Sequence, residues 1–125
     1  MKNIILLLGL FFSSFCFSQN ATTKELVFTK KVIDYGKVSN DTTLIATFIA
    51  KNKSSQDVII NYVNPECTCT SYYVSKYDIQ PNDTVSITLT IKTTGKFGKE
   101  KIYAIVNYGQ KKMTKLTVKC DIYEK

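Results

Sequence analysis

The chain of 125 residues contains no histidine, no arginine and no tryptophan. Without histidine, a serine–histidine–acid catalytic set cannot be built. Without arginine, the chain has no planar guanidinium group, which can bind phosphate through two hydrogen bonds. The 17 lysines are spread along the chain and are adjacent only at 30–31 and 111–112. The formal charge of +7 therefore indicates a solvated, lysine-rich surface, and we expect no nucleic-acid partner.

Acidic residues, proline and glycine are also scarce. None of the ten Asp and Glu residues has a spacing that suggests the paired carboxylates of a glycosidase. We therefore expect a protein that is not an enzyme and has no cofactor. With two prolines and five glycines, no proline-rich or glycine-rich linker divides the chain, which predicts one domain.

Residues 1–18 have the pattern of a secretory signal peptide. Lys2 precedes an apolar run over residues 4–12, and small and polar residues follow. The run is shorter than the roughly 20 residues that span a membrane. We expect cleavage after Ser18 and export to the periplasm, the outer membrane surface or the extracellular space, with no transmembrane segment after removal of the signal. Lipidation of Cys16 is the alternative, but Phe15 stands where a small residue normally precedes a lipidated cysteine.

After the signal peptide, residues 19–24 are predicted to be a short flexible lead, and 25–125 to form the domain. Apolar and polar residues alternate along several short segments, which is typical of β-strands with one buried face. In segment 115–123 this alternation points Cys120 inward. The predicted strands lie in segments 25–30, 32–36, 42–52, 57–63, 71–77, 83–92, 99–108 and 115–123. Seven to eight short strands in one domain predict an all-β fold, an immunoglobulin-like antiparallel β-sandwich.

Four stretches of the sequence resemble successive signatures of the bacterial domain-of-unknown-function family 1573. They are IDYGKV at 33–38 and the segments 47–71, 79–108 and 115–122, which hold the counterparts of the family's F-x-x-x-N strand, C-G-C-T turn, G-x-F-G hairpin and closing strand. The resemblance implies an exported immunoglobulin-like domain, related to Hydin-type sandwiches and common in Bacteroidetes, with no established activity. The chain departs from the family in two places: Thr68 replaces the glycine of the C-G-C-T turn, and Cys120 stands where a glycine usually ends the closing strand.

The pair Cys67 and Cys69 leaves three hypotheses open. Residues i and i+2 of a strand lie roughly 6.5–7 Å apart at Cα, at or beyond disulfide range, so a bond between them needs a local bend. The first hypothesis is a structural disulfide, within the pair or from one member to Cys120; we slightly favour a pair beside a buried, apolar Cys120. The second is thiol–disulfide exchange, for which no helix N-terminus or histidine is in view. The third is a Cu(I) site formed by Cys67, Cys69 and Cys120.

Two further features concern partners. Asp41-Thr42-Thr43 and Asp83-Thr84-Val85 loosely resemble O-glycan acceptors of exported proteins, so Thr42 and Thr84 are candidate glycosylation sites. The expected function is an exported, non-catalytic binding or scaffold module whose partner is an envelope protein or glycan. The alternative is an extracytoplasmic thiol–disulfide or Cu(I)-handling protein centred on Cys67 and Cys69.

Overall fold

The computed structural model describes residues 26–125, so the predicted signal peptide and lead lie outside the described residues. The described chain forms nine β-strands and no helix. The strands are β1 (Leu26–Phe28), β2 (Val32–Ser39), β3 (Thr43–Asn52), β4 (Val58–Pro65), β5 (Thr70–Val74), β6 (Asp78–Ile79), β7 (Thr84–Lys92), β8 (Gly98–Tyr108) and β9 (Lys112–Tyr123).

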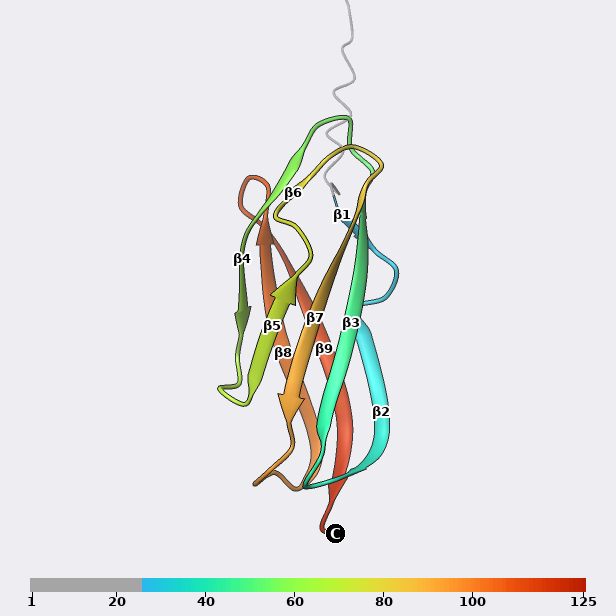
Figure 1. The fold of residues 1–125 in the computed structure, drawn as a ribbon, viewed down its shortest axis with the longest axis vertical. Helices are drawn as coiled ribbons and strands as arrows, with labels where there is room; N and C mark the ends of the chain where they lie inside the picture. Colours follow the sequence, from blue (N-terminus) through green and yellow to red (C-terminus); the bar gives the residue numbers. More distant parts are fainter. Residues whose placement is uncertain (1–25) are drawn as a thin grey trace, which may run out of the picture.

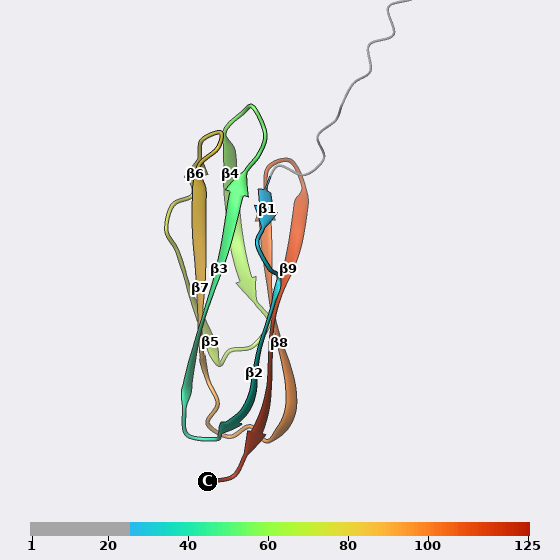
Figure 2. The same cartoon turned by 90° about the vertical axis from the view of Figure 1, so that its right-hand side faces the viewer.

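The strands form two sheets that pack face to face, as the two layers in Figure 2 show. One sheet, here called sheet A, has the order β1-β3-β7-β5, and the other, sheet B, has the order β2-β9-β8-β4-β6. In Figure 1, sheet A lies in front of β8 and β9. The prediction of an all-β, two-sheet sandwich is confirmed.

The core lies between the sheets and follows the alternation in the sequence. Along β3 every second side chain is buried, because successive side chains of a strand point to opposite faces. Phe48 at its centre has no exposed surface, and β7 opposes it with Ile87 in register. The inner face of β9 contributes Cys120, which is 4% exposed, in agreement with the inward orientation predicted for it.

Two details of the predicted topology differ from the structure. The sandwich is not wholly antiparallel, because β2 runs parallel to β9. This arises because the chain leaves sheet A after β1 and crosses to the edge of sheet B without reversing its direction along the sandwich. The described residues hold nine strands instead of seven or eight; the additional one, β6, has two residues and is too short to show alternation.

A buried asparagine ties the end of β3 to the loop that follows it and to β6. Asn52 has no exposed surface; its Nδ2 donates hydrogen bonds to the carbonyl oxygens of Gln56 and Ile79, both at 2.8 Å. Its Oδ1 accepts from the backbone N–H and the hydroxyl of Ser54, at 2.9 and 2.7 Å. All polar atoms of this side chain are satisfied, as burial in a protein core requires.

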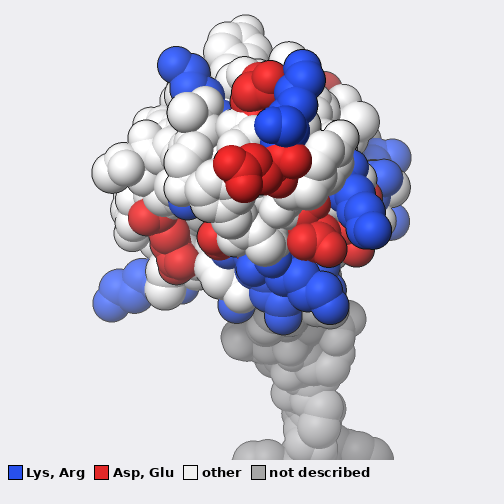
Figure 3. Space-filling model, turned by 90° about the horizontal axis from the view of Figure 1, so that it is seen from below, with Lys and Arg blue, Asp and Glu red and all other residues white. Residues whose placement is uncertain are grey.

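The charged side chains are distributed over the surface. Figure 3 shows lysines and acidic residues interspersed on the end of the sandwich that carries the β2–β3 and β7–β8 connections. Lys76 pairs with Asp83, and Lys125 with Asp41. This mixture is what a solvated, lysine-rich surface presents.

Candidate functional site: the disulfide turn between the sheets

The two neighbouring cysteines lie where the chain crosses from sheet B to sheet A. β4 ends at Pro65 in sheet B and β5 begins at Thr70 in sheet A. Both ends of the crossing are held by backbone hydrogen bonds: Glu66 N donates to Tyr103 O on β8 at 3.0 Å, and Lys92 N on β7 donates to Cys69 O at 3.1 Å. The crossing is therefore anchored to both sheets.

A turn within this crossing brings the two cysteines into bonding range. Thr70 N donates to Cys67 O at 3.1 Å, and this bond closes the turn. The Cα atoms of Cys67 and Cys69 lie 5.1 Å apart and the side chains form a disulfide, so the turn is the bend that such a bond needs. Thr68 at its tip is exposed and is not among the residues with positive φ. Its replacement of glycine therefore causes no left-handed backbone strain.

The surroundings of the two sulfurs are polar and differ between them. Cys69 N donates a hydrogen bond to Cys67 Sγ at 3.1 Å. The hydroxyl of Thr70 lies 3.5 Å from Cys69 Sγ. Both cysteines are half-buried and pack against the edge of the core.

Each of the two cysteines also lines its own surface hollow. The hollow at Cys67, about 470 Å³, lies on the β8 side and is lined by Glu66, Lys96, Glu100 and Lys101, among others. The hollow at Cys69, about 230 Å³, lies on the β5 and β7 side and includes Lys92. The lysines were missed by sequence reasoning, since they come from distant segments that only the fold brings to the turn.

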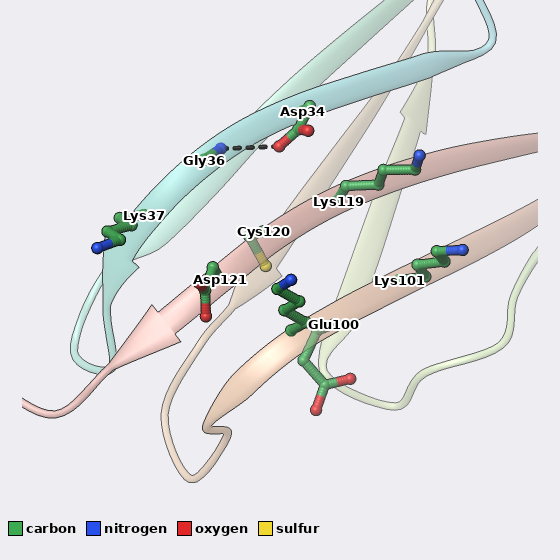
Figure 4. Close-up of a pocket in the computed structure, with 9 residues that line it drawn as sticks. Asp34, Gly36, Lys37, Glu100, Lys101, Lys119, Cys120 and Asp121 are labelled. Atoms are coloured by element: carbon green, nitrogen blue, oxygen red, sulfur yellow. Dashed lines mark hydrogen bonds between the residues drawn. The ribbon is translucent and has the colours of Figure 1, made fainter.

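Cys120 lies apart from this pair. It is free, buried, and lines a third hollow of about 380 Å³ between β2, β8 and β9, shown in Figure 4. Burial, and then the carboxylates of Glu100 and Asp34, raise the pKa of its thiol. Cys120 is thus a protonated, apolar side chain at neutral pH.

The structure does not assemble the three-cysteine Cu(I) site. Within residues 26–125, no three side chains of Cys, Asp or Glu gather closely enough to hold a metal ion. The disulfide joins Cys67 to Cys69 and leaves Cys120 out, so the hypotheses that involve Cys120 have no geometry to support them here.

The remaining candidates from the sequence lie elsewhere. Thr84 is exposed at the start of β7, whereas Thr42 is half-buried and its backbone N–H donates to the Thr93 hydroxyl at 3.0 Å. Glycosylation of either residue stays a prediction.

Among the tyrosines, Tyr72 and Tyr73 are exposed on β5, at the edge of sheet A. Residues 26–125 include no helix that is long and apolar enough to cross a membrane.

Solved structures with the same architecture define the class of domain. A protein of unknown function from Porphyromonas gingivalis W83 is similar with a TM-score of 0.67 at 12% identity, over 77% of this chain and 46% of that one. The Vibrio cholerae VesB protease reaches 0.68 at 11%, over 80% of this chain but 32% of the protease. The ASH/PapD-like domain of human CEP192 reaches 0.59 at 12%, over 81% and 87%. At these identities the likeness concerns the fold alone, an immunoglobulin-like, PapD-like sandwich.

The family of the chain follows from its sequence. A model of the family described as "Protein of unknown function (DUF1573)" matches residues 26–122, so the chain belongs to this family. The match confirms the family inferred from the sequence motifs. No curated protein sequence is significantly similar to the chain. The chain spans less than half of the length of the Porphyromonas and Vibrio proteins.

Proposed function

We propose that the protein is an exported, non-catalytic binding module that takes up an extended peptide segment of an envelope protein along the open edge of β5. The observation that carries the proposal is that β5 is an open edge of sheet A with no charge, no proline and no bulge. An extended segment that joins a sheet edge is held by main-chain hydrogen bonds, and its alternate side chains give specificity.

The other edges of the two sheets are short or irregular. β1 has three residues and pairs with β3 only at Ala50, Lys51 and Asn52; along the rest of β3 the hydroxyl of Tyr35 donates a hydrogen bond to Ile45 O. β6 has two residues. β2 carries charged residues and a bulge between Asp34 and Lys37, and β4, which β6 covers only at its start, has a bulge after Ile60 and ends in Pro65. Short strands, charges, bulges and prolines are the features that keep edges from pairing with other chains.

β5 has none of these features. Its five residues, TSYYV, include no charge and no proline, and they pair with β7 without a break in register. Cys69 O and Ser75 N bond to β7. Because hydrogen-bonding directions alternate along an antiparallel strand, the N–H and C=O groups of Tyr72 and Val74 point to the open side. Within residues 26–125 no strand pairs with that side.

The side chains beside this edge favour an uncharged partner strand. Tyr72 and Tyr73 are 43% and 66% exposed. Tyr73 lies in register with Thr88, which is hydrogen-bonded to Thr47 at 3.2 Å, so a row of uncharged side chains continues from the edge across the outer face of sheet A. Exposed Ile45 lies on the same face. Tyrosine offers a large apolar surface with a polar tip, which suits a contact face.

The experiment that tests the proposal selects short peptides that bind the folded domain from a random library. Amide hydrogen exchange is then measured with and without a selected peptide. We expect the peptide to slow the exchange of the Tyr72 and Val74 amides, because strand addition gives these groups hydrogen-bond partners. If every selected peptide protects amides elsewhere, or if none binds, the proposal is wrong.

A pair of proline variants separates the edge from the fold. Tyr72→Pro removes an N–H that faces the open side, so the domain should fold while peptide affinity falls roughly 5-fold to 150-fold, equivalent to about 1–3 kcal/mol for an unsatisfied partner. Tyr73→Pro removes an N–H bonded to β7 and should destabilise the domain itself. Tyr72→Thr keeps the N–H and removes the ring, and so measures the contribution of the side chain.

A further inference from the structure

We propose that the Cys67–Cys69 disulfide is a thiol–disulfide exchange site that reacts with an extracytoplasmic dithiol, with Cys69 as the attacked sulfur and Cys67 as the leaving group. The proposal does not depend on peptide binding at β5. It rests on the anchoring of the turn, on the unequal surroundings of the two sulfurs and on the lysines beside them.

The turn is held without the help of the disulfide. The bond from Thr70 N to Cys67 O closes it, and the bonds from Glu66 N to Tyr103 O and from Lys92 N to Cys69 O fix its two ends. These are backbone bonds that reduction leaves intact. The disulfide itself closes a loop of only three residues, which removes little entropy from the unfolded chain. The fold can therefore retain both the oxidised and the reduced pair.

The two sulfurs differ in their ability to carry negative charge. Cys67 Sγ accepts the N–H of Cys69 at 3.1 Å, a bond that becomes charge-assisted and stronger when the sulfur is a thiolate. The charged residues that line the hollow at Cys67 are Lys96, Lys101, Glu66 and Glu100, and their formal charges balance, so the backbone N–H is the feature that distinguishes Cys67. Hydrogen-bond donors and nearby cations lower the pKa of a thiol. The sulfur with the lower pKa is the better leaving group, which assigns this role to Cys67.

Cys69 is open to attack from the other side. Its hollow is bounded by β5 and β7 of sheet A, whereas the hollow at Cys67 is bounded by β8 of sheet B. Lys92 lines the hollow at Cys69 and provides a positive charge toward an approaching thiolate. A nucleophile that enters here reaches Cys69, and attack on its sulfur breaks the bond to Cys67.

The reaction balances in two steps. A thiolate of the partner dithiol attacks Cys69 Sγ, the bond between the two sulfurs breaks, and its electron pair leaves on Cys67 Sγ. The second thiolate of the partner attacks the partner sulfur now bound to Cys69, which forms the partner's disulfide and releases Cys69 as a thiolate. The partner loses two electrons and two protons, and Cys67 and Cys69 gain them. The reverse sequence oxidises the pair.

The first experiment equilibrates the native domain in buffers with graded ratios of reduced to oxidised dithiothreitol, followed by alkylation and mass determination. We expect Cys67 and Cys69 to be reduced and reoxidised reversibly without loss of the β-sheet signal in circular dichroism. Cys120, which is 4% exposed, is the internal control and should react only after unfolding. A disulfide that becomes reducible only when urea unfolds the domain would overturn the proposal.

The second experiment tests which sulfur leaves. Cys69→Ser retains the backbone N–H that bonds Cys67 at 3.1 Å, whereas in Cys67→Ser the hydrogen-bond partner of Cys69 Sγ is the more distant Thr70 hydroxyl at 3.5 Å. We expect the thiol of Cys67 in the first variant to be alkylated at neutral pH about three- to fourfold faster than that of Cys69 in the second, because a pKa lower by one unit gives about tenfold more thiolate but lowers the intrinsic nucleophilicity of that thiolate by about threefold. Equal rates, or a faster Cys69, would overturn the assignment of roles.

Two lysine variants measure the electrostatic contribution. Lys96→Gln should slow alkylation of Cys67 in the Cys69→Ser background and shift its pH profile upward. The matched control is Lys53→Gln, in the exposed β3–β4 connection at the opposite end of the sandwich (Figure 1). If both changes have the same effect on the profile, the lysine beside the turn has no specific part in the reaction.

Discussion

The substitution Asn52→Asp is a sharp test of how the sandwich is held together, because it exchanges one polar group of a buried side chain for another of nearly the same size. The amide group that donates to Gln56 O and Ile79 O becomes a second carboxyl oxygen, which cannot donate when ionised. Two carbonyl oxygens at 2.8 Å then face an oxygen instead of a donor. The contacts of Oδ1 with Ser54 are unchanged in shape.

The magnitude follows from the number of lost bonds and from the buried charge. When protonated, the carboxyl introduced at position 52 can donate to the buried Ile79 O, while Gln56 O, which also lies 2.8 Å from the Ser54 hydroxyl, loses one donor, at a cost of about 0.5–1.5 kcal/mol for a lost hydrogen bond. Ionisation adds to this, because burial raises the pKa of the carboxyl in the folded state above its value of about 3.9 in the unfolded state. The added cost is absent below the unfolded pKa and grows by about 1.36 kcal/mol per pH unit up to the folded pKa, so that it can reach about 4 kcal/mol by about pH 7.

Urea unfolding of the wild type and the variant at about pH 4.5 and about pH 7 measures both parts. We expect the difference in the free energy of unfolding between variant and wild type to be larger at the higher pH. Asn61→Asp is the matched control: its amide donates to Asn107 and Gly109, but the residue is exposed, so the loss should stay below about 1 kcal/mol. A difference for the Asn52 variant that is equal at both pH values would refute the reasoning.

Three further predictions concern stability. The double change Cys67→Ser and Cys69→Ser should cost about 1.6 kcal/mol in urea unfolding, the chain-entropy value for a three-residue loop, and a loss above about 4 kcal/mol would show that the disulfide has a larger structural role. Lys76 holds the pKa of Asp83 below its ordinary value of 3.8. This pair therefore contributes stability above pH 3.8 and loses that contribution as the pH falls through the folded pKa. Asp83→Asn should lower the thermal midpoint at neutral pH and leave it unchanged in strong acid; an equal shift of the midpoint at both pH values would contradict this. Phe48→Ala should cost about 3–5 kcal/mol, because Phe48 is fully buried, and a loss below about 1 kcal/mol in urea unfolding would contradict its central place in the core.

Both functional proposals concern the segment from Glu66 to Val74. The disulfide turn ends where β5 begins, and the open edge of β5 follows directly. They remain separable in experiment, because Tyr72→Pro leaves both cysteines in place and the serine variants leave the edge of β5 in place. If peptide binding survives the loss of the disulfide, the edge of β5 acts by itself. If disulfide exchange survives Tyr72→Pro, the exchange site acts by itself.

The cysteine pair of the candidate site could be predicted from the sequence, but the arrangement of the residues around it could not. The spacing of Cys67 and Cys69 showed that a disulfide needs a bend, and the structure provides it through the bond from Thr70 N to Cys67 O. The lysines beside the cysteines could not be predicted, because they lie far along the chain. Lys92 comes close to Cys69 through the pairing of β5 with β7, and Lys96, in the β7–β8 connection, lines the hollow at Cys67.

The sequence by itself determined the class of fold, the approximate place of eight strands and, for the four strands with clear alternation, the side that faces the core. It could do so because the period of two in a strand is a local property: alternate residues must lie on one face whatever the strand packs against. The inward orientation of Cys120 was readable for this reason. Only the tertiary structure decided that β2 pairs in parallel with β9, that Asn52 joins β3 to β6, and that β5 is left as an open edge. These depend on which strands become neighbours, and strand pairing joins residues far apart in the chain, so no local pattern encodes it.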